Sequence, residues 1–153
     1  MEVKDSYILL PQPIEEEAVL LLKNAGIKVV IAPDPKPETV APLMKKAKGI
    51  ILRTGIKITN ELISKAEDLW TISRTGAGVD NVDVKEATQR GIVVVNAPTG
   101  NTISAAEHTI ALMLSLARHI PQANAVLKSG VWQRSDFIGT EIRHKTLGII
   151  GLG

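Results

Sequence analysis

The feature that most constrains the fold of this chain is the regular spacing of short apolar segments along its amino-terminal part. Segments typical of buried strands begin at Tyr7, Lys28, Gly49, Thr71 and Ile92, so that one begins every 21 or 22 residues. Helical patterns fill the intervals, and strands that alternate with helices are typical of a parallel sheet covered on both faces. The spacing predicts an α/β fold, namely a flavodoxin-like, doubly wound domain with five parallel strands in the order 2-1-3-4-5.

The individual elements follow from apolar patterns, caps and stop signals. Strands are expected at 7–10, 28–31, 49–52, 71–74 and 92–95, and helices at 14–24, 40–48, 60–66 and 84–90. Thr59 is a suitable cap for the third helix. Asp83 and Glu86 have the spacing of a capping box, which predicts that the fourth helix begins after Asp83.

A candidate binding site lies where two of these strands end. Ligands of doubly wound sheets bind beyond the carboxyl ends of the strands. Arg53 follows the third strand, and a turn that contains Gly76 and Gly78 follows the fourth, so both are expected at the same edge. A glycine turn leaves backbone N–H groups unshielded, which favours a small anion. The same Gly-x-Gly pattern also serves simply to make a turn, so a purely structural role stays open.

The chain changes character after residue 97, where the alternation of strand and helix stops. Residues 1–97 are expected to form one domain, and residues 98–153 the beginning of another. A helix at 105–118, preceded by a capping box at Ser104 and Glu107, is apolar almost all round, which predicts that it is buried between two bodies. A further helix is expected to begin at Pro121.

The last residues have the pattern of a strand at 146–150 followed by Gly-Leu-Gly at 151–153. A strand that leads into Gly-x-Gly opens a dinucleotide-binding unit. The third glycine, the helix and the distal acidic residue of that unit do not follow. We therefore expect the chain to stop inside a second domain of the Rossmann type.

Composition excludes several classes of function. There is no cysteine, which excludes disulfides and thiolate–metal sites, and a cytoplasmic location is then the default. No signal peptide opens the chain, and its most apolar run, at 109–117, is far shorter than the ~20 residues that span a bilayer. Basic and acidic residues are balanced at 13 each up to residue 97, and number 5 and 3 thereafter. We expect neither a membrane nor a nucleic acid as a partner, and no metal site.

Four blocks of sequence, in a fixed order, carry a resemblance to a known family. They are RTGAGVDNVD at 74–83, NAPTGNTISAAE at 96–107, ARHIPQ at 117–122 and GTEI…KTLGIIGLG at 139–153. Together they closely resemble the D-isomer-specific 2-hydroxyacid dehydrogenases, and the resemblance covers the whole chain. It implies a substrate-binding domain followed by a Rossmann domain, and NAD-dependent oxidation of a small anionic 2-hydroxy acid.

The resemblance also implies roles for individual residues. Substrate contacts are implied for Arg53, Thr54, Gly76, Ala77, Gly78, Val79, Asn101 and Arg134, and cofactor contacts for Gly151 and Gly153. Residues 104–143 would form the arm of a homodimer, through which Arg134 reaches the partner subunit's active site. Ala77 departs from the threonine or valine of related enzymes, so a side-chain contact to the cofactor is expected to be absent there.

No catalytic residue is assigned within this chain. The arginine, glutamate and histidine of the family, and the acidic residue that selects NAD over NADP, would lie beyond residue 153. His108, His119 and His144 have no carboxylate at a spacing typical of an acid–base pair, which favours structural roles. The chain alone is expected to be inactive. A non-catalytic binding or assembly module of the same fold, and a reductase of glyoxylate or hydroxypyruvate, remain open alternatives.

Overall fold

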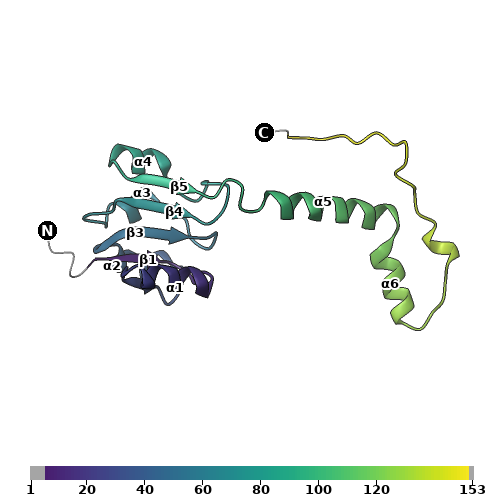
Figure 1. The fold of residues 1–153 in the computed structure, drawn as a ribbon, viewed down its shortest axis with the longest axis horizontal. Helices are drawn as coiled ribbons and strands as arrows, with labels where there is room; N and C mark the ends of the chain where they lie inside the picture. The colour runs from purple at the N-terminus through teal and green to yellow at the C-terminus, as the bar shows by residue number, and fades with distance from the viewer. Residues whose placement is uncertain (1–5, 152–153) are drawn as a thin grey trace. The chain divides into compact units, whose positions relative to one another are not determined.

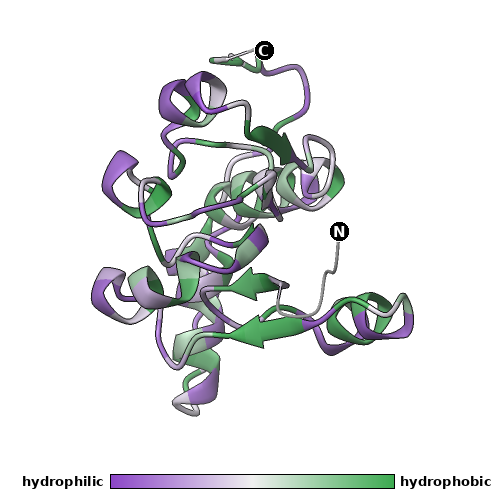
Figure 2. Cartoon of the chain, turned by 90° about the vertical axis from the view of Figure 1, so that its left-hand side faces the viewer, coloured by the Kyte–Doolittle hydropathy of each residue, from purple (hydrophilic) through white to green (hydrophobic). Residues whose placement is uncertain are grey.

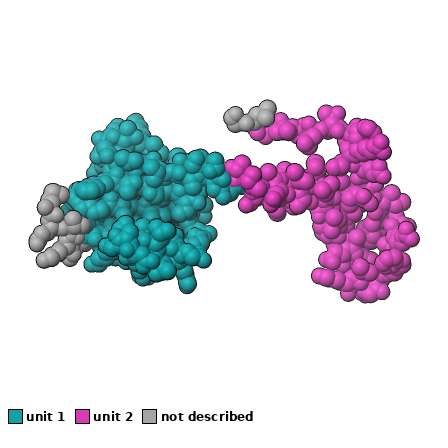
Figure 3. All heavy atoms as spheres, in the orientation of Figure 1, with its two compact units in different colours: residues 1–101 teal, residues 102–153 magenta. Residues whose placement is uncertain are grey.

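The structure, a computed structural model, describes residues 6–151. The chain divides into two compact units, Met1–Asn101 and Thr102–Gly153, which Figure 3 colours separately. The division falls a few residues after the boundary expected at residue 97. No helix among residues 6–151 combines the length and the apolar character needed to cross a membrane.

The first unit is built on a five-stranded sheet (Figure 1). Its strands are β1 (Tyr7–Leu10), β2 (Val29–Ile31), β3 (Ala47–Leu52), β4 (Thr71–Arg74) and β5 (Val93–Asn96). All neighbouring strands are parallel and their order is β2-β1-β3-β4-β5. The predicted α/β fold, its strand number and its strand order are confirmed.

Four helices connect the strands: α1 (Glu16–Asn24), α2 (Pro37–Met44), α3 (Asn60–Ile63) and α4 (Val84–Gln89). The step from β1 to β2 runs opposite to the later steps across the sheet. Because such crossovers are right-handed, α1 covers one face, and α2, α3 and α4 cover the other. The second helix starts earlier than expected, at Pro37, because proline fits the first turn of a helix. β3 also starts earlier, because Ala47 pairs with Tyr7 of β1.

The core of this unit lies between the sheet and the helices α2 and α3, which cover one of its faces. Leu9, Ile50 and Ile72 on the strands and Met44 and Ile63 on the helices are completely buried. Figure 2 shows the strands as hydrophobic (green) segments. Each such side chain contributes about 1.5–3 kcal/mol relative to leaving it exposed. The sheet is therefore a rigid base for the loops that leave its carboxyl edge.

The second unit contains α5 (Thr102–Ala117), α6 (Ile120–Lys128) and a short 3₁₀ turn (Ser135–Phe137). The corner between α5 and α6 is His119, whose φ of 54° is left-handed. No residue of α5 is buried, and Leu116 is 75% exposed. The described residues do not bury this helix, so the expectation that it is buried between two bodies is wrong for them. Ser104 does not cap the helix, because α5 already begins at Thr102.

The strand expected at 146–150 is absent from the described part of the chain. These residues are exposed and extended without strand pairing, and Leu147 and Ile149 are each 65% exposed. A strand exists only through its ladder of hydrogen bonds, and none of the described strands pairs with this segment. Gly151 has a left-handed φ of 84°, a conformation that favours glycine. Gly153, the other glycine expected to contact a cofactor, lies outside the described residues.

Candidate functional site

The carboxyl edge of the sheet brings the loops after β3, β4 and β5 together. Leu52 pairs with Arg74, and Arg74 pairs with Asn96, so these strands end in register. Arg53, Thr75 and Ala97, the next residues of the three loops, therefore emerge at the same edge of the sheet. We call this line of loops the ligand edge.

The glycine turn, defined as Gly76, Ala77, Gly78 and Val79, is held in place through its carbonyl groups. The Ala97 N–H donates to the Gly76 carbonyl at 3.1 Å, and the Asn96 side-chain amide donates to the Ala77 carbonyl at 2.6 Å. The Val82 N–H donates to the Val79 carbonyl at 3.0 Å. Among residues 6–151, no hydrogen-bond acceptor is found for the N–H groups of the turn itself. The turn therefore offers a row of free donors, which is chemistry that suits a carboxylate or phosphate.

The two glycines of this turn have ordinary backbone conformations, since neither Gly76 nor Gly78 has a positive φ. A Cβ atom on Gly76 would overlap the guanidinium of Arg74, which lies against it. A Cβ atom on Gly78 would stand 2.9 Å from Oδ1 of Asp80. Both neighbours are the ends of flexible side chains that can move aside, so the close approaches do not by themselves require glycine.

Arg53 is a cation of the ligand edge. Its guanidinium lies 3.7 Å from Oε1 of Glu15, and the two side chains are 48% and 64% exposed. Exposed ion pairs of this kind contribute only about 0–1 kcal/mol, so an incoming anion can replace the glutamate at small cost. Thr54, the next residue, is also exposed. Gln12, at the end of β1, fixes the same loop by accepting a hydrogen bond from the Gly55 N–H at 2.7 Å.

The loops after β3 and β4 are joined to each other. Ile58 and Val82 form an isolated parallel bridge, in which the Ile58 N–H donates to the Asn81 carbonyl at 2.8 Å. The Asn81 side-chain amide donates to the carbonyl groups of Arg53 at 2.7 Å and Ile56 at 3.1 Å. Asn81, Gln12 and Arg74 were not predicted as parts of this edge. Their places directly beside ligand-edge loops are the sequence signal for them, but this signal does not indicate which groups they contact.

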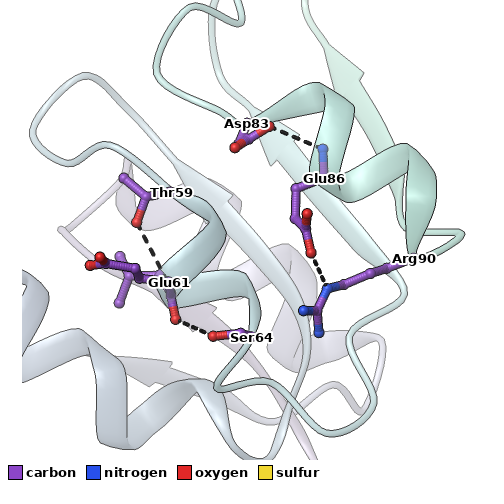
Figure 4. A network of polar contacts seen from close by, with 7 residues as sticks. Thr59, Glu61, Ser64, Asp83, Glu86 and Arg90 are labelled. Carbon is purple, nitrogen blue, oxygen red and sulfur yellow. Dashed lines mark hydrogen bonds and ion pairs between the residues drawn. The ribbon is translucent and has the colours of Figure 1, made fainter.

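The helix that follows the glycine turn begins as expected, but its capping box is only half formed (Figure 4). Oδ1 of Asp83 accepts a hydrogen bond from the Glu86 N–H at 3.0 Å. The Glu86 carboxylate does not return to the Asp83 N–H, because it binds Nε of Arg90 at 2.6 Å. The Asp83 N–H instead donates to the Ile58 carbonyl at 2.9 Å, which ties the helix start to the loop after β3.

The other residues that the resemblance singled out lie further along the chain. Asn101 is exposed at the end of the first unit. Arg134 precedes the 3₁₀ turn of the second unit, and Gly151 belongs to that unit as well. Among residues 6–151, no group of three His, Asp or Glu side chains could hold a metal ion.

Comparison with known proteins identifies the family. The sequence profile described as "D-isomer specific 2-hydroxyacid dehydrogenase, catalytic domain" matches residues 8–149. The chain belongs to the D-isomer specific 2-hydroxyacid dehydrogenase family. This result confirms the resemblance that the four sequence blocks indicated.

Relatives within the family carry more specific names. The chain is 49% identical to a D-3-phosphoglycerate dehydrogenase of Archaeoglobus fulgidus over 95% of its own length and 28% of that protein. It is 42% identical to the human D-3-phosphoglycerate dehydrogenase, over 95% of the chain and 27% of that protein. The chain thus spans about a quarter of the length of these relatives.

Solved structures of the family share the fold. The NADPH-dependent glyoxylate/hydroxypyruvate reductase of Sinorhizobium meliloti, in complex with citrate, has a TM-score of 0.82 at 30% identity, over 97% of this chain and 47% of that one. The cofactor(NAD+)-bound 3-phosphoglycerate dehydrogenase of Entamoeba histolytica has a TM-score of 0.63 at 35% identity, over 74% and 40%.

Proposed function

We propose that this chain supplies the substrate-binding domain, and the start of the cofactor domain, of an NAD-dependent D-3-phosphoglycerate dehydrogenase in the cytoplasm. Such an enzyme oxidises 3-phospho-D-glycerate to 3-phosphooxypyruvate, the entry to serine biosynthesis. The observation that carries the proposal is the similarity, over nearly the whole chain, to curated dehydrogenases of that name. The free N–H donors of the glycine turn, beside Arg53, support it because the substrate is an anion at both ends.

In this proposal the chain binds and orients the substrate. The N–H groups of Gly76, Ala77, Gly78 and Val79 would receive the carboxylate, and Arg53 and Thr54 would contact the same molecule. Asn101 and, from the partner subunit, Arg134 would complete the set. Orientation of this kind removes up to about 7–11 kcal/mol from the barrier of a two-reactant step.

The cofactor would supply the hydride acceptor, but the described residues do not by themselves form its cradle. A dinucleotide site needs a paired strand, a glycine loop and a helix. Residues 146–150 are unpaired, and of the two glycines in the Gly-x-Gly pattern at 151–153 only Gly151 lies among the described residues. We therefore propose that the 153-residue chain alone has no measurable dehydrogenase activity. NADH formation from 3-phosphoglycerate, followed at high protein concentration, is the test, and clear turnover would contradict it.

Substrate binding can be tested directly on this chain by NMR titration with 3-phosphoglycerate. We expect weak binding, with amide shifts centred on Arg53 and the glycine turn. D-Glycerate, which has the carboxylate and hydroxyl but no phosphate, is the matched ligand. Equal affinity for the two would favour the second candidate function, a glyoxylate or hydroxypyruvate reductase. The Sinorhizobium structure to which this chain is similar is an enzyme of that name. Shifts that avoid both loops would rule out this site.

Arg53→Ala is expected to weaken the binding of 3-phosphoglycerate by about tenfold or more, because hydrogen bonds to charged groups contribute about 1.5–3 kcal/mol. Arg90→Ala is the matched control, since Arg90 also pairs with a glutamate but lies on α4. Equal losses in the two variants would show that net charge, and not position, governs binding. The third possibility, a self-sufficient binding module, would be favoured if the coding sequence after residue 153 carried no dehydrogenase catalytic residues.

We further propose that residues 104–143 mediate a homodimer. Ile110 is 54% exposed, Leu112 57% and Leu116 75%, which is unusual for a helix this apolar. Sedimentation equilibrium at micromolar concentration tests the proposal. Leu116→Ser should weaken association, whereas Leu21→Ser on α1, where the leucine is 71% exposed, should not. A monomeric wild-type chain would refute it.

A further inference from the structure

One side chain joins the two loops of the candidate site. The Nδ2 group of Asn81 has two hydrogens, and both are used: one bond reaches the Arg53 carbonyl at 2.7 Å and the other the Ile56 carbonyl at 3.1 Å. The acceptor atom Oδ1 faces Nε of Arg74 at 3.4 Å, at the end of β4. Asn81 itself lies two residues after the glycine turn. The amide therefore connects the loop that carries Arg53 to the loop that carries the free N–H donors.

The backbone anchors the Arg53 loop at its two ends. At the near end the Thr75 N–H donates to the Leu52 carbonyl at 3.0 Å, and at the far end Ile58 forms its bridge with Val82. Gly55 is held from the other side, by Gln12. Between Leu52 and Ile58, the hydrogen bonds from the Asn81 amide are the ones found, among residues 6–151, that tie this loop to the loop after β4. Without that amide, residues 53–57 would be tied to the loop after β4 only at their two ends.

The chemistry of an amide suits this position. It donates to two carbonyl groups without adding a charge beside an anion site, whereas an aspartate would repel both the carbonyl oxygens and the ligand. Asn81 is half-buried and is not a member of the apolar core. Loss of its side chain should therefore change the conformation of the loops after β3 and β4 and leave the sheet folded.

We propose that Asn81 is a positioning residue, which fixes the conformation of the Arg53 loop beside the glycine turn and so prepares the site for a doubly anionic ligand. The proposal rests on the proposed function in its choice of ligand. It predicts that the site is already formed in the free protein, because every bond that Asn81 makes is within the chain.

The test compares Asn81→Leu, which has a similar volume and no donors, with the control Asn60→Leu at an exposed position of α3. In the ligand-free 153-residue chain, Asn81→Leu should shift the backbone amides of residues 53–56 and 76–79 and leave those of β1 and β2 unchanged. Its dissociation constant for 3-phosphoglycerate, measured well below the unfolding temperature of the variant, should rise at least tenfold. Asn60→Leu should do neither. If Asn81→Leu does not fold, Asn81→Ser, which keeps one donor, should show the same changes at smaller size.

Each outcome decides between the two proposals. An Asn81→Leu chain that is folded, binds within twofold of wild type and keeps its loop amides in place overturns the inference. If the wild type does not bind 3-phosphoglycerate, the proposed function of the site fails. In that case, changed NMR shifts of the backbone amides of residues 76–79 in ligand-free Asn81→Leu still support the positioning role. Unchanged shifts overturn it.

Discussion

The two units of this chain differ in where their apolar side chains lie. In the first unit, Leu9, Ile50 and Ile72 are completely buried, and helices adjacent in sequence cover the strands that hold them. In the second unit no residue of α5 or α6 is buried, although α5 is the more apolar helix by sequence. The comparison shows that apolar content alone does not make a core. The first unit has one because each of the strands β1 to β4 is followed by a helix that packs against the sheet.

The largest effect is expected when the two units are separated. Residues 1–101 alone should keep a cooperative unfolding transition, because their core is complete. Residues 102–153 alone should be largely unfolded at low concentration, since isolated helices shorter than ~12–15 residues are marginal in water and α6 has 9 residues. Circular dichroism with thermal unfolding measures both. Cooperative unfolding of 102–153 at low concentration would contradict the comparison, whereas folding only at high concentration would point to self-association.

A matched pair of isoleucines sharpens the same contrast within the intact chain. Ile72→Ala in β4, where the side chain is 0% exposed, should lower the free energy of unfolding by about 2–5 kcal/mol. Ile110→Ala in α5, where it is 54% exposed, should change it by less than about 0.5 kcal/mol. Urea unfolding at low protein concentration compares the two midpoints. Similar losses would show that α5 is covered in solution.

A smaller effect is expected at a helix start. Asp83 caps α4 with its side chain, whereas α6 begins at His119 without a side-chain cap bond. Asp83→Ala should cost about 1 kcal/mol of stability, and Asp83→Asn, which keeps the acceptor, should cost much less. Urea titration measures the difference. Equal costs for the two changes would mean that the negative charge matters more than the hydrogen bond.

The smallest effect concerns pH. The Lys36 N–H at 3.1 Å, and then the Thr39 side chain, lower the pKa of Asp34 below its ordinary value. A carboxyl whose folded-state pKa is lowered adds stability above its unfolded pKa and loses it as the pH falls through the folded value. Asp34→Asn should therefore flatten the acid limb of the stability curve. Asp136→Asn in the second unit is the control, and an identical effect there would remove Asp34 as the cause.

Sequence reasoning predicted the first unit well because its fold follows from neighbours in sequence. The spacing from Tyr7 to Ile92, the cap at Asp83 and the shared edge of Arg53 and the glycine turn all rest on local patterns. Helix and strand ends were less accurate, because Ala47 joins β3 through its pairing with Tyr7, a distant residue.

The errors share a physical cause, which is dependence on partners far along the chain. The strand expected at 146–150 required a neighbouring strand, and the burial of α5 required a covering surface. Asn81 was missed for the same reason: its amide binds carbonyl groups 25 and 28 residues away, and no local pattern indicates such contacts. The roles of Thr54, Asn101 and Arg134 in binding stay predictions.

The bridge between Ile58 and Val82 has a consequence for how this edge can vary during evolution. Five residues separate the end of β3 from Ile58, and the span from β4 to Val82 is fixed by the glycine turn. An insertion or deletion in either span would shift one side of the bridge by a residue and turn a buried side chain toward water. The lengths of the two loops are therefore inherited together. Among homologues, changes in loop length should accumulate in the connection from β2 to α2, which this bridge does not constrain.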